Sequence, residues 1–389
     1  MLVFETEEFT ERLRKVRHRM ASASLEALIV SDPCNIYYLT GFVVWAFYTP
    51  QALLIFQDED PLLVIRKMDV AGARLTSWLS DDQIIGYDES LVQTQDGHPF
   101  SVVAQTIIDH RHDKSYIGIE SESYYLSVRS YQELSKALPN AQLIDSQFLV
   151  NWVRFQKSPA EVKVMKKAGA LLSQNMMQTA NALHSGVTER EVVSVAYASN
   201  ILGTDDYGGA YSSSPAFVLS GERIGMPHLP WTDGKIATNT QVNLELMGNR
   251  KRYQCTMGRT VYVGQPPAKL LELEKIVCDA IETVLNVVKP GVACETVART
   301  LYRALAAHGI EKDSRCGYSV GITYPPTGGE LTASFRLGDE TELVPGATMH
   351  FLPAIWSGGA SIIISEPFVV TETGYDLLCD VPRALFVRD

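Results

Sequence analysis

A long helix, a break and a second helix constrain the fold of the C-terminal half of this chain. Residues 158–183 are predicted to form the first helix, because Ser158 suits the capping position and Pro159 suits the first turn. Glu161 stands three residues after Ser158, which is the spacing of a reciprocal capping box. The segment 184–189 breaks this helix, and a second helix begins within it.

The same order of elements occurs again later in the chain. Helices are predicted over residues 267–288 and 295–308, and Lys289-Pro290-Gly291 separates them. Strand-like segments follow each pair of helices. Two units of this kind predict two related α+β halves within one domain.

Strand-like and helical segments alternate in the N-terminal part, which is typical of an α/β domain. An amphipathic helix is predicted over residues 6–24, and an apolar strand over 25–30 ends at the turn signal Ser31-Asp32-Pro33. The segments that follow are predicted strands at 52–56, 61–65 and 116–119 and predicted helices at 69–78, 100–110 and 127–138.

The pattern changes near Trp152, so we place the domain boundary within residues 145–157. The predicted domains are residues 1–150 and 151–389. A chain of 389 residues is too long for one ordinary core, which agrees with two domains.

Composition and charge exclude several classes of protein. A net charge of −11 without a basic run argues against a nucleic-acid binder. No apolar stretch approaches the length of a membrane span, and the acidic start lacks the features of a signal peptide. We therefore expect a cytoplasmic protein with free thiols, since its cysteines are scattered: Cys34, Cys255, Cys278, Cys294, Cys316 and Cys379.

Six motifs occur in a characteristic order along the chain: Asn35-Ile36-Tyr37-Tyr38-Leu39-Thr40-Gly41, Lys157-Ser158-Pro159-Ala160-Glu161, Pro227-His228-Leu229, Arg259-Thr260, Gly317-Tyr318-Ser319 and Ile364-Ser365-Glu366-Pro367. Their order resembles that of the creatinase and aminopeptidase P family, which is M24-like. That family has an α+β pita-bread C-terminal domain with pseudo-twofold halves, preceded by a smaller creatinase-type α/β N-terminal domain. The resemblance covers nearly the whole chain and implies this fold.

Five positions of this framework are Asp, Asp, His, Glu and Glu in the metallopeptidase branch, where they bind two divalent ions. In this chain the five residues are Glu245, Thr256, Tyr318, Leu352 and Ser365. One carboxylate and no imidazole cannot hold two hard cations, because each cation needs several oxygen or nitrogen ligands. We therefore predict a hydrolase that uses no metal ion and no other cofactor.

Further stretches of the chain are informative: Leu39-Thr40-Gly41, Trp45-Ala46-Phe47-Tyr48, Gly97-His98-Pro99, Leu149-Val150-Asn151-Trp152, Pro227-His228-Leu229, and Tyr324-Pro325-Pro326 with Gly329-Glu330. They resemble the ectoine hydrolases, a metal-free branch of the family. This resemblance implies opening of the cyclic amidine ring of ectoine or hydroxyectoine to N-acetyl-diaminobutyrate. Two loops depart from the branch, because Val43-Val44 stands in place of a polar, glycine-containing step and Thr327-Gly328 stands in place of an Asp-Trp pair. The exact ligand therefore stays open.

The resemblance implies His228, Glu245 and Tyr318 as catalytic residues. Creatinase uses a histidine at the position of His228, but its two carboxylates are replaced here by Gly258 and Leu352, which argues against creatine as substrate. An imidazole can take a proton from water and deliver one to a leaving nitrogen. A carboxylate can pair with an amidinium or attack its carbon. A tyrosine hydroxyl can donate to a developing tetrahedral centre.

Each candidate also has a structural interpretation. His228 can be an ordinary loop residue, and Tyr318 can fill the space of a lost metal ion. Glu245 lies in an otherwise apolar strand, where an unpaired carboxylate is costly, although Arg250 or Arg252 can pair with it. We interpret the remaining polar or reactive residues near these motifs as structural: Cys255, His98, His350 and Ser365.

Five residues are predicted to bind the substrate. Trp45, Phe47 and Tyr48 form an aromatic cluster that can stack on a flat amidinium. Phe47 matches an aromatic residue that, in creatinase, reaches from one subunit into the active site of the other, which implies a homodimer. Arg315 is the candidate for binding a substrate carboxylate, and Glu330 belongs to a stretch that resembles the ectoine hydrolases.

The sequence thus predicts a homodimeric hydrolase of a small ectoine-like zwitterion, with a deacetylase acting on its product. One alternative is a creatinase-like hydrolase of another C–N bond in an amidine or guanidine compound. Another is a pita-bread module that binds without catalysis. Retention of both His228 and Glu245 favours catalysis, because a pure binding module needs neither. Whether Glu245 or water is the nucleophile stays open.

Overall fold

The computed structural model describes residues 2–357 and 360–389. The chain divides into two compact units, Met1–Arg154 and Phe155–Asp389. Their boundary lies inside the stretch 145–157, where the sequence pattern changes. Within the described ranges, no helix is both long and apolar enough to cross a membrane.

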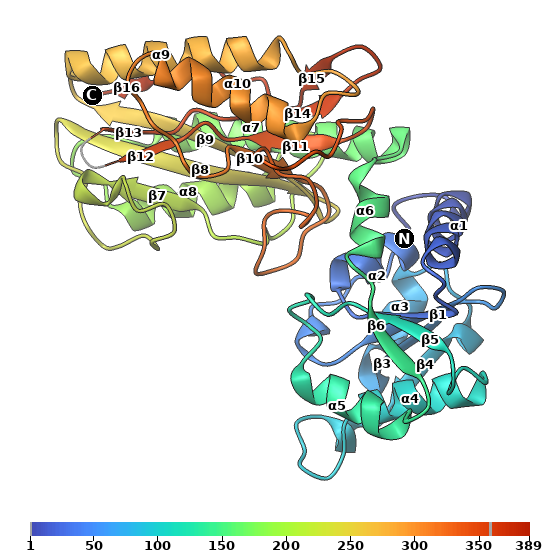
Figure 1. Cartoon of the computed structure of the whole chain (residues 1–389). Coiled ribbons are helices and arrows are strands. Elements are labelled where there is room, and N and C mark those ends of the chain that lie inside the picture. Colours follow the sequence, from blue (N-terminus) through green and yellow to red (C-terminus); the bar gives the residue numbers. More distant parts are fainter. Residues whose placement is uncertain (1, 358–359) are drawn as a thin grey trace. The chain divides into compact units, whose positions relative to one another are not determined.

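The N-terminal unit contains one mixed six-stranded sheet (Figure 1). Its elements are α1 (Thr6–Ser22), β1 (Ala27–Val30), α2 (Pro33–Thr40), η1 (Ala46–Tyr48), β2 (Ala52–Phe56), β3 (Leu62–Arg66), η2 (Lys67–Asp69), α3 (Val70–Thr76), η3 (Asp81–Gln83), β4 (Ile84–Tyr87), η4 (Glu89–Leu91), α4 (Phe100–Asp109), β5 (Tyr116–Ile119), α5 (Val128–Ala137), β6 (Gln142–Asp145) and α6 (Leu149–Phe155). The strand order is β4-β3-β2-β1-β5-β6, in which β2 is antiparallel to both neighbours and the other pairs are parallel.

Helices cover both faces of this sheet, which explains why its central strands are apolar throughout. On one face, Leu54 and Phe56 of β2 belong to the same core as Val103 and Ile107 of α4 and Leu134 of α5. The alternate residues of β2 point to the other face and are also buried. The unit is therefore a layered α/β structure.

In its described residues, the C-terminal unit has two pairs of helices and three sheets. Its elements are α7 (Pro159–Asn181), α8 (Glu189–Leu202), β7 (Phe217–Ser220), η5 (Gly221–Arg223), β8 (Thr240–Arg250), β9 (Tyr253–Val263), α9 (Ala268–Leu285), α10 (Cys294–Ala306), β10 (Gly317–Ser319), β11 (Thr348–Phe351), β12 (Ile355–Ser357), β13 (Ala360–Ile362), β14 (Glu366–Val370), β15 (Tyr375–Leu377) and β16 (Phe386–Arg388). The sheets have the orders β16-β9-β8-β7 and β10-β11-β14-β15, and β12 pairs with β13.

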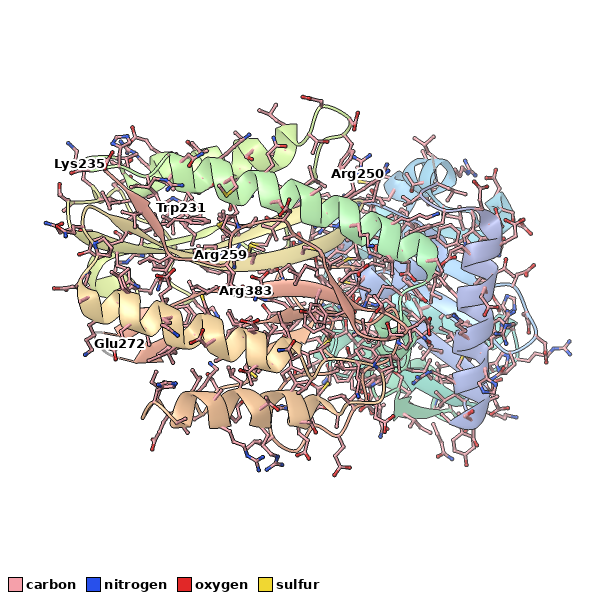
Figure 2. The ribbon with its side chains drawn as sticks, turned by 90° about the horizontal axis from the view of Figure 1, so that it is seen from above. Trp231, Lys235, Arg250, Arg259, Glu272 and Arg383 are labelled. Carbon is pink, nitrogen blue, oxygen red and sulfur yellow. The ribbon has the colours of Figure 1, made fainter. Side chains whose placement is uncertain are left out.

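The pairs α7–α8 and α9–α10 lie on opposite sides of the strands (Figure 2). Helix α7 packs closely on β8, because a Cβ at Gly248 would come within 2.3 Å of the carbonyl oxygen of Ala168. Glycine at 248 therefore sets the distance between helix and sheet. The layered arrangement corresponds to the repeated helical units that the sequence predicts.

Local sequence signals account for several helix starts. Ser158 and Glu161 form the predicted capping box, with the Glu161 amide donating to Ser158 Oγ at 3.2 Å and the Ser158 amide to the Glu161 carboxylate at 3.0 Å. One turn prediction was wrong. Ser31-Asp32-Pro33 begins helix α2, because the Asp32 carboxylate accepts from the Cys34 amide at 2.7 Å and Pro33 suits the first helical turn.

Candidate active site

Glu245 lies near the middle of β8, between two antiparallel neighbours. It stands opposite Phe217 of β7 and opposite Gly258 of β9. Opposed residues in an antiparallel pair point to the same face of the sheet, so Glu245 stands between an aromatic ring and a position without a side chain. A Cβ at residue 258 would come within 2.0 Å of Ile363 Cδ1. Glycine is therefore required there for Ile363 to pack against this face.

The Glu245 carboxylate is half-buried. Burial raises its pKa to about 7. In the part of the chain that the structure describes, no hydrogen bond or ion pair engages it. The two arginines that could have neutralised it donate elsewhere: Arg250 Nη1 to the carbonyl of Gly208 at 2.7 Å, and Arg252 Nε to the carbonyl of Thr323 at 3.1 Å. Glu245 is therefore a carboxylate available to a ligand.

Tyr318 and His350 face each other across β10 and β11. They are register partners, their rings meet edge to face with centroids 5.4 Å apart, and His350 Nδ1 lies 3.3 Å from Tyr318 Oη. On its other side, His350 Nε2 lies 2.8 Å from Ser365 Oγ, which accepts a hydrogen bond from the Gly258 amide at 2.6 Å. This chain of contacts ends at Gly258, the residue opposite Glu245.

Burial and the surrounding charges favour the neutral forms of His350 and Tyr318. Burial lowers the pKa of His350 to about 3, and the positive charges of Arg259 and Arg315 act in the same direction. Burial also raises the pKa of Tyr318 well above its usual value, and the Glu245 charge adds to this effect. The resting site thus contains a neutral imidazole and a protonated phenol close to Glu245.

Arg315, the candidate for binding a substrate carboxylate, lies beside Tyr318. Its guanidinium carbon is 4.7 Å from the centroid of the Tyr318 ring, which is the geometry of a cation–π contact. The side chain is exposed, and Nη1 lies 3.4 Å from Ser334 Oγ. Arg315 therefore keeps hydrogen-bond donors for an anionic group.

His228 lies on the exposed segment after η5, and its ring meets the Phe217 ring edge to face at a centroid distance of 6.1 Å. Buried Glu189, at the start of α8, ties this segment at both ends. Its carboxylate accepts from Arg223 Nη1 at 2.8 and 2.6 Å, and from the Thr232 amide at 2.7 Å. The sequence alone did not identify this anchor, because its partners are more than thirty residues away.

Thr256 lies diagonally across the β8–β9 pair from Glu245. Its register partner is Met247, two residues from Glu245, so Thr256 and Glu245 point to the same face. The Thr256 side chain is 3% exposed, and its hydroxyl has no hydrogen-bond partner among the described residues. A buried hydroxyl without a partner beside a free carboxylate is a position where a water molecule or a ligand group can bind.

A buried ion-pair network supports the strand next to Ser365. The Glu366 carboxylate accepts from Arg259 Nη2 at 2.9 Å and from Arg383 Nε at 3.1 Å. Figure 2 shows Arg259 and Arg383 side by side between the long strands and α9. Because Glu366 follows Ser365 directly, this network holds the Ser365 hydroxyl in place beside His350.

The residues at the five positions of the two-metal framework do not fit two divalent ions. They offer one carboxylate at Glu245, three hydroxyls and the aliphatic side chain of Leu352, and the hydroxyl of Ser365 is already bonded to Gly258 and His350. Among the described residues, no three His, Cys, Asp or Glu side chains converge in a way that could hold a metal ion. A two-metal mechanism therefore does not fit the side chains of this site.

Two other residues considered in the sequence, Glu330 and Cys255, have side chains that are buried and engaged inside the unit. Glu330 forms an ion pair with Lys157, and both side chains are 1% exposed, so its charge is neutralised inside the unit. Cys255 is buried with Sγ 3.6 Å from the Met165 carbonyl, and burial raises its pKa well above the usual value. Cys255 is therefore a poor nucleophile.

The three aromatic candidates belong to the N-terminal unit. Trp45 and Phe47 meet edge to face at 5.1 Å, and Phe47 also contacts Tyr125 at 5.8 Å. Trp45 and Tyr48 are 59% and 62% exposed. Exposure of two large aromatic side chains on one short helical turn is typical of a surface that another molecule covers.

Known proteins share this architecture along the whole chain. The Creatinase/Prolidase N-terminal domain matches residues 12–156, and Metallopeptidase family M24 matches residues 163–372. The prolidase of Thermococcus sibiricus has the same fold, with a TM-score of 0.86 over 97% of this chain and 99% of that chain, at 19% identity. The predicted creatinase-type N-terminal domain and pita-bread C-terminal domain are confirmed.

Two curated relatives are similar over their full lengths. The uncharacterized hydrolase/peptidase y4tM of Sinorhizobium fredii is 42% identical, over 100% of both chains. The ectoine hydrolase of Halomonas elongata is 37% identical, over 100% of this chain and 99% of its own. Similarity of this extent identifies the chain as a hydrolase of the same family.

Proposed function

Since this chain belongs to the creatinase and M24 family of hydrolases, we propose that it opens the ring of a cyclic amidine, with ectoine or hydroxyectoine as substrate. The observation that carries this proposal is the free Glu245 carboxylate with a pKa near 7, in a site whose described residues form no set of metal ligands. The 37% identity to the protein named ectoine hydrolase supports the same substrate class.

A carboxylate whose pKa is raised by burial suits a cationic amidinium. Pairing with the amidinium offsets the cost of desolvating the charge, so the substrate itself favours the ionised form of Glu245. The carboxylate then either holds the amidinium in place or attacks its carbon. In both cases one water molecule adds to that carbon overall, and one C–N bond breaks.

The remaining catalytic candidates have roles that follow from their positions. His228, held beside Phe217, takes the proton from water and returns one to the leaving ring nitrogen. Tyr318 donates a hydrogen bond to the charge that develops at the tetrahedral carbon. Arg315, exposed beside the Tyr318 ring, binds the substrate carboxylate. The product is an N-acetyl-diaminobutyrate.

Three further features belong to the proposal. The enzyme works without a metal ion, it acts as a homodimer, and a deacetylase consumes its N-acetylated product. Phe47, with Trp45 and Tyr48, covers the amidinium in the partner subunit's site. Glu330 contributes through its ion pair with Lys157, because this ion pair holds the segment that precedes Glu330.

The second candidate is hydrolysis of a C–N bond in a different small amidine or guanidine. It is favoured by Val43-Val44 and Thr327-Gly328, which depart from the ectoine hydrolase pattern in two loops. A non-catalytic binding module is the third candidate. The free carboxylate of Glu245 argues against it, because a pure binding module does not need this group.

A substrate panel tests these candidates. Purified protein is incubated with ectoine, hydroxyectoine, creatine and an Xaa-Pro dipeptide, and products are followed by proton NMR. We expect N-acetyl-diaminobutyrate from ectoine and no dipeptide cleavage. Dipeptide hydrolysis alone would overturn the proposal. Turnover of creatine alone would favour the second candidate, and ectoine-induced thermal stabilisation without turnover would favour the binding module.

A further inference from the structure

A line of hydrogen-bonding groups runs behind the candidate active site, from the Gly258 amide through Ser365 and His350 to Tyr318. The distances are 2.6 Å from Gly258 N to Ser365 Oγ, 2.8 Å from Ser365 Oγ to His350 Nε2, and 3.3 Å from His350 Nδ1 to Tyr318 Oη. Ser365 and His350 are completely buried. We infer that His350 is a positioning residue, protonated on Nδ1, that turns the Tyr318 hydroxyl hydrogen toward the substrate.

The direction of the line is set at Ser365. Its oxygen accepts the hydrogen of the Gly258 amide, which leaves the serine hydroxyl hydrogen to be donated. Among the described residues, no acceptor other than His350 Nε2, at 2.8 Å, lies within hydrogen-bond distance of this hydroxyl. Accepting one hydrogen bond also polarises a hydroxyl and strengthens the bond that it donates. His350 Nε2 therefore carries no hydrogen.

A neutral imidazole has one hydrogen, so it resides on Nδ1. The positive charges of Arg259 and Arg315 and complete burial disfavour a second proton on this ring. Nδ1–H then donates to Tyr318 Oη at 3.3 Å. Because Tyr318 Oη accepts from His350, its own hydrogen is available to the site.

The Tyr318 hydroxyl keeps its hydrogen because Glu245 and burial both oppose ionisation of the phenol. Its hydrogen serves as a fixed donor for the charge that develops on the substrate. No bond to hydrogen breaks in this role. The substrate is the one proposed above, whereas the hydrogen-bond arrangement does not depend on it.

The reverse arrangement would have a different consequence. With the hydrogen on Nε2, His350 would donate to Ser365, and Tyr318 would have to donate its hydrogen to Nδ1. The phenol would then offer only lone pairs to the substrate. The position of one hydrogen on His350 therefore decides between a donor and an acceptor at the site.

Solid-state 15N NMR of protein with ring-labelled histidine tests this inference without any substrate. The chain has eight histidines, and the His350 signals are those that disappear in His350→Asn. His98 is an internal reference for the opposite form, because its Nδ1 accepts from the Phe100 amide at 3.1 Å and its hydrogen must be on Nε2. We expect His350 to be protonated on Nδ1; protonation on Nε2 overturns the inference.

Kinetics on ectoine supply the second readout. The amide of asparagine can replace the Nδ1–H donor to Tyr318, whereas that of glutamine extends toward Ser365, so His350→Asn should keep more activity than His350→Gln. Tyr318→Phe should lower kcat by about a hundredfold, the scale of one lost donor, with little change in KM. In the Tyr318→Phe background, neither His350 substitution should lower kcat further. Equal losses in both backgrounds would make His350 merely structural and overturn the inference.

The two readouts separate the possible failures. If His350 is protonated on Nδ1 but ectoine is not converted, the proposed substrate is wrong and the positioning role stands. Melting curves of each variant show whether it folds. If His350→Asn does not fold, sequential 13C–15N correlations through Met349 and Phe351 in uniformly labelled protein identify the His350 signals, and the NMR measurement remains decisive.

Discussion

Phe217 stands directly opposite Glu245 in the antiparallel pair of β7 and β8. Its ring also meets the His228 imidazole, with 6.1 Å between centroids. Phe217 therefore neighbours Glu245 through the strand pairing and the His228 imidazole through its ring. Glu245 and His228, both among the described residues, form no ion pair with each other.

Removal of either catalytic group should abolish most turnover. Glu245→Gln keeps shape and hydrogen bonding but removes the charge that pairs with an amidinium, and His228→Ala removes the group that moves protons. We expect each change to lower ectoine turnover by at least about a hundredfold. The double variant should lose far less than the product of the two losses, because both act on one reaction path.

Glu272→Gln is a matched control, because Glu272 is an exposed glutamate of α9 (Figure 2). It should have normal activity. A well-folded Glu245→Gln protein with near-normal activity would make Glu245 a structural residue.

The raised pKa of Glu245 predicts opposite pH dependences for activity and stability. The ionised form reacts, so kcat/KM should rise as pH increases through about 7. Bound amidinium favours the ionised form, so the corresponding pKa in kcat should be lower. In the folded state Glu245 keeps its proton at pH values above its usual pKa of 4.5. The free energy of unfolding should therefore fall between pH 4.5 and about 7 and stay constant above.

Glu245→Gln should remove this fall in the free energy of unfolding, because glutamine has no proton to release in this range. Denaturant titrations of the wild-type protein and the variant at several pH values measure the difference. If the free energy of unfolding depended on pH in the same way in both proteins, the raised pKa of Glu245 would be contradicted.

The residues at the five framework positions predict that activity needs no metal ion. Elemental analysis of the purified protein should show no stoichiometric Mn, Fe, Co or Zn, and incubation with EDTA should leave turnover unchanged. The physical reason is that one carboxylate cannot neutralise two divalent ions. Two tightly bound ions per chain, with activity lost on chelation, would contradict this prediction and support the metallopeptidase mechanism instead.

A shared active site predicts complementation between two weak variants. Phe47→Ala lacks the aromatic ring that we expect to reach the partner subunit's site, and Glu245→Gln lacks the carboxylate. A mixed dimer would then contain one site with both groups. Mixing and reassociation of the two variants should restore activity toward a quarter of the normal value, as measured on ectoine, because half of the dimers would be mixed. Light scattering should show a dimer, and an active monomer would contradict this prediction.

Thr256→Val should raise stability and lower activity together. The buried hydroxyl without a partner among the described residues costs about 1–3 kcal/mol, which valine of the same shape avoids. The melting temperature should therefore rise, while kcat falls if the hydroxyl holds water or substrate beside Glu245. Thr323→Val is the matched control, because the described residues likewise offer the buried Thr323 hydroxyl no partner. It should gain stability with unchanged kcat.

The resemblance to the family identified Glu245, and the position of this carboxylate in an otherwise apolar strand strengthened the prediction. His350 is likewise a polar residue in an apolar strand, between Met349 and Phe351. The sequence did not show which groups would face its imidazole. His350 was therefore interpreted as structural. Glu189 and Thr256 carried no local signal, since their roles depend on residues brought near by the fold.

The sequence also could not decide whether Glu245 has an ion-pair partner. Arg250 and Arg252 are close in sequence and could have neutralised the carboxylate. The structure shows that both guanidinium groups donate to backbone carbonyls instead. Proximity along the chain did not decide the partner, because the direction of each side chain depends on strand register and loop path.

The sequence by itself determined the elements, the family and the residue types at the five framework positions. The elements follow from local periodicity and capping residues. The family and the framework positions follow from the resemblance of the motifs and their order to a known family, and neither kind of signal needs distant contacts. Only the tertiary structure decided that Phe217, Glu245 and Gly258 lie in one row, that His350 faces Tyr318, and that Glu245 has no partner among the described residues. Hydrogen-bond partners and desolvation depend on groups far apart in the chain, so they exist only once the strands have paired.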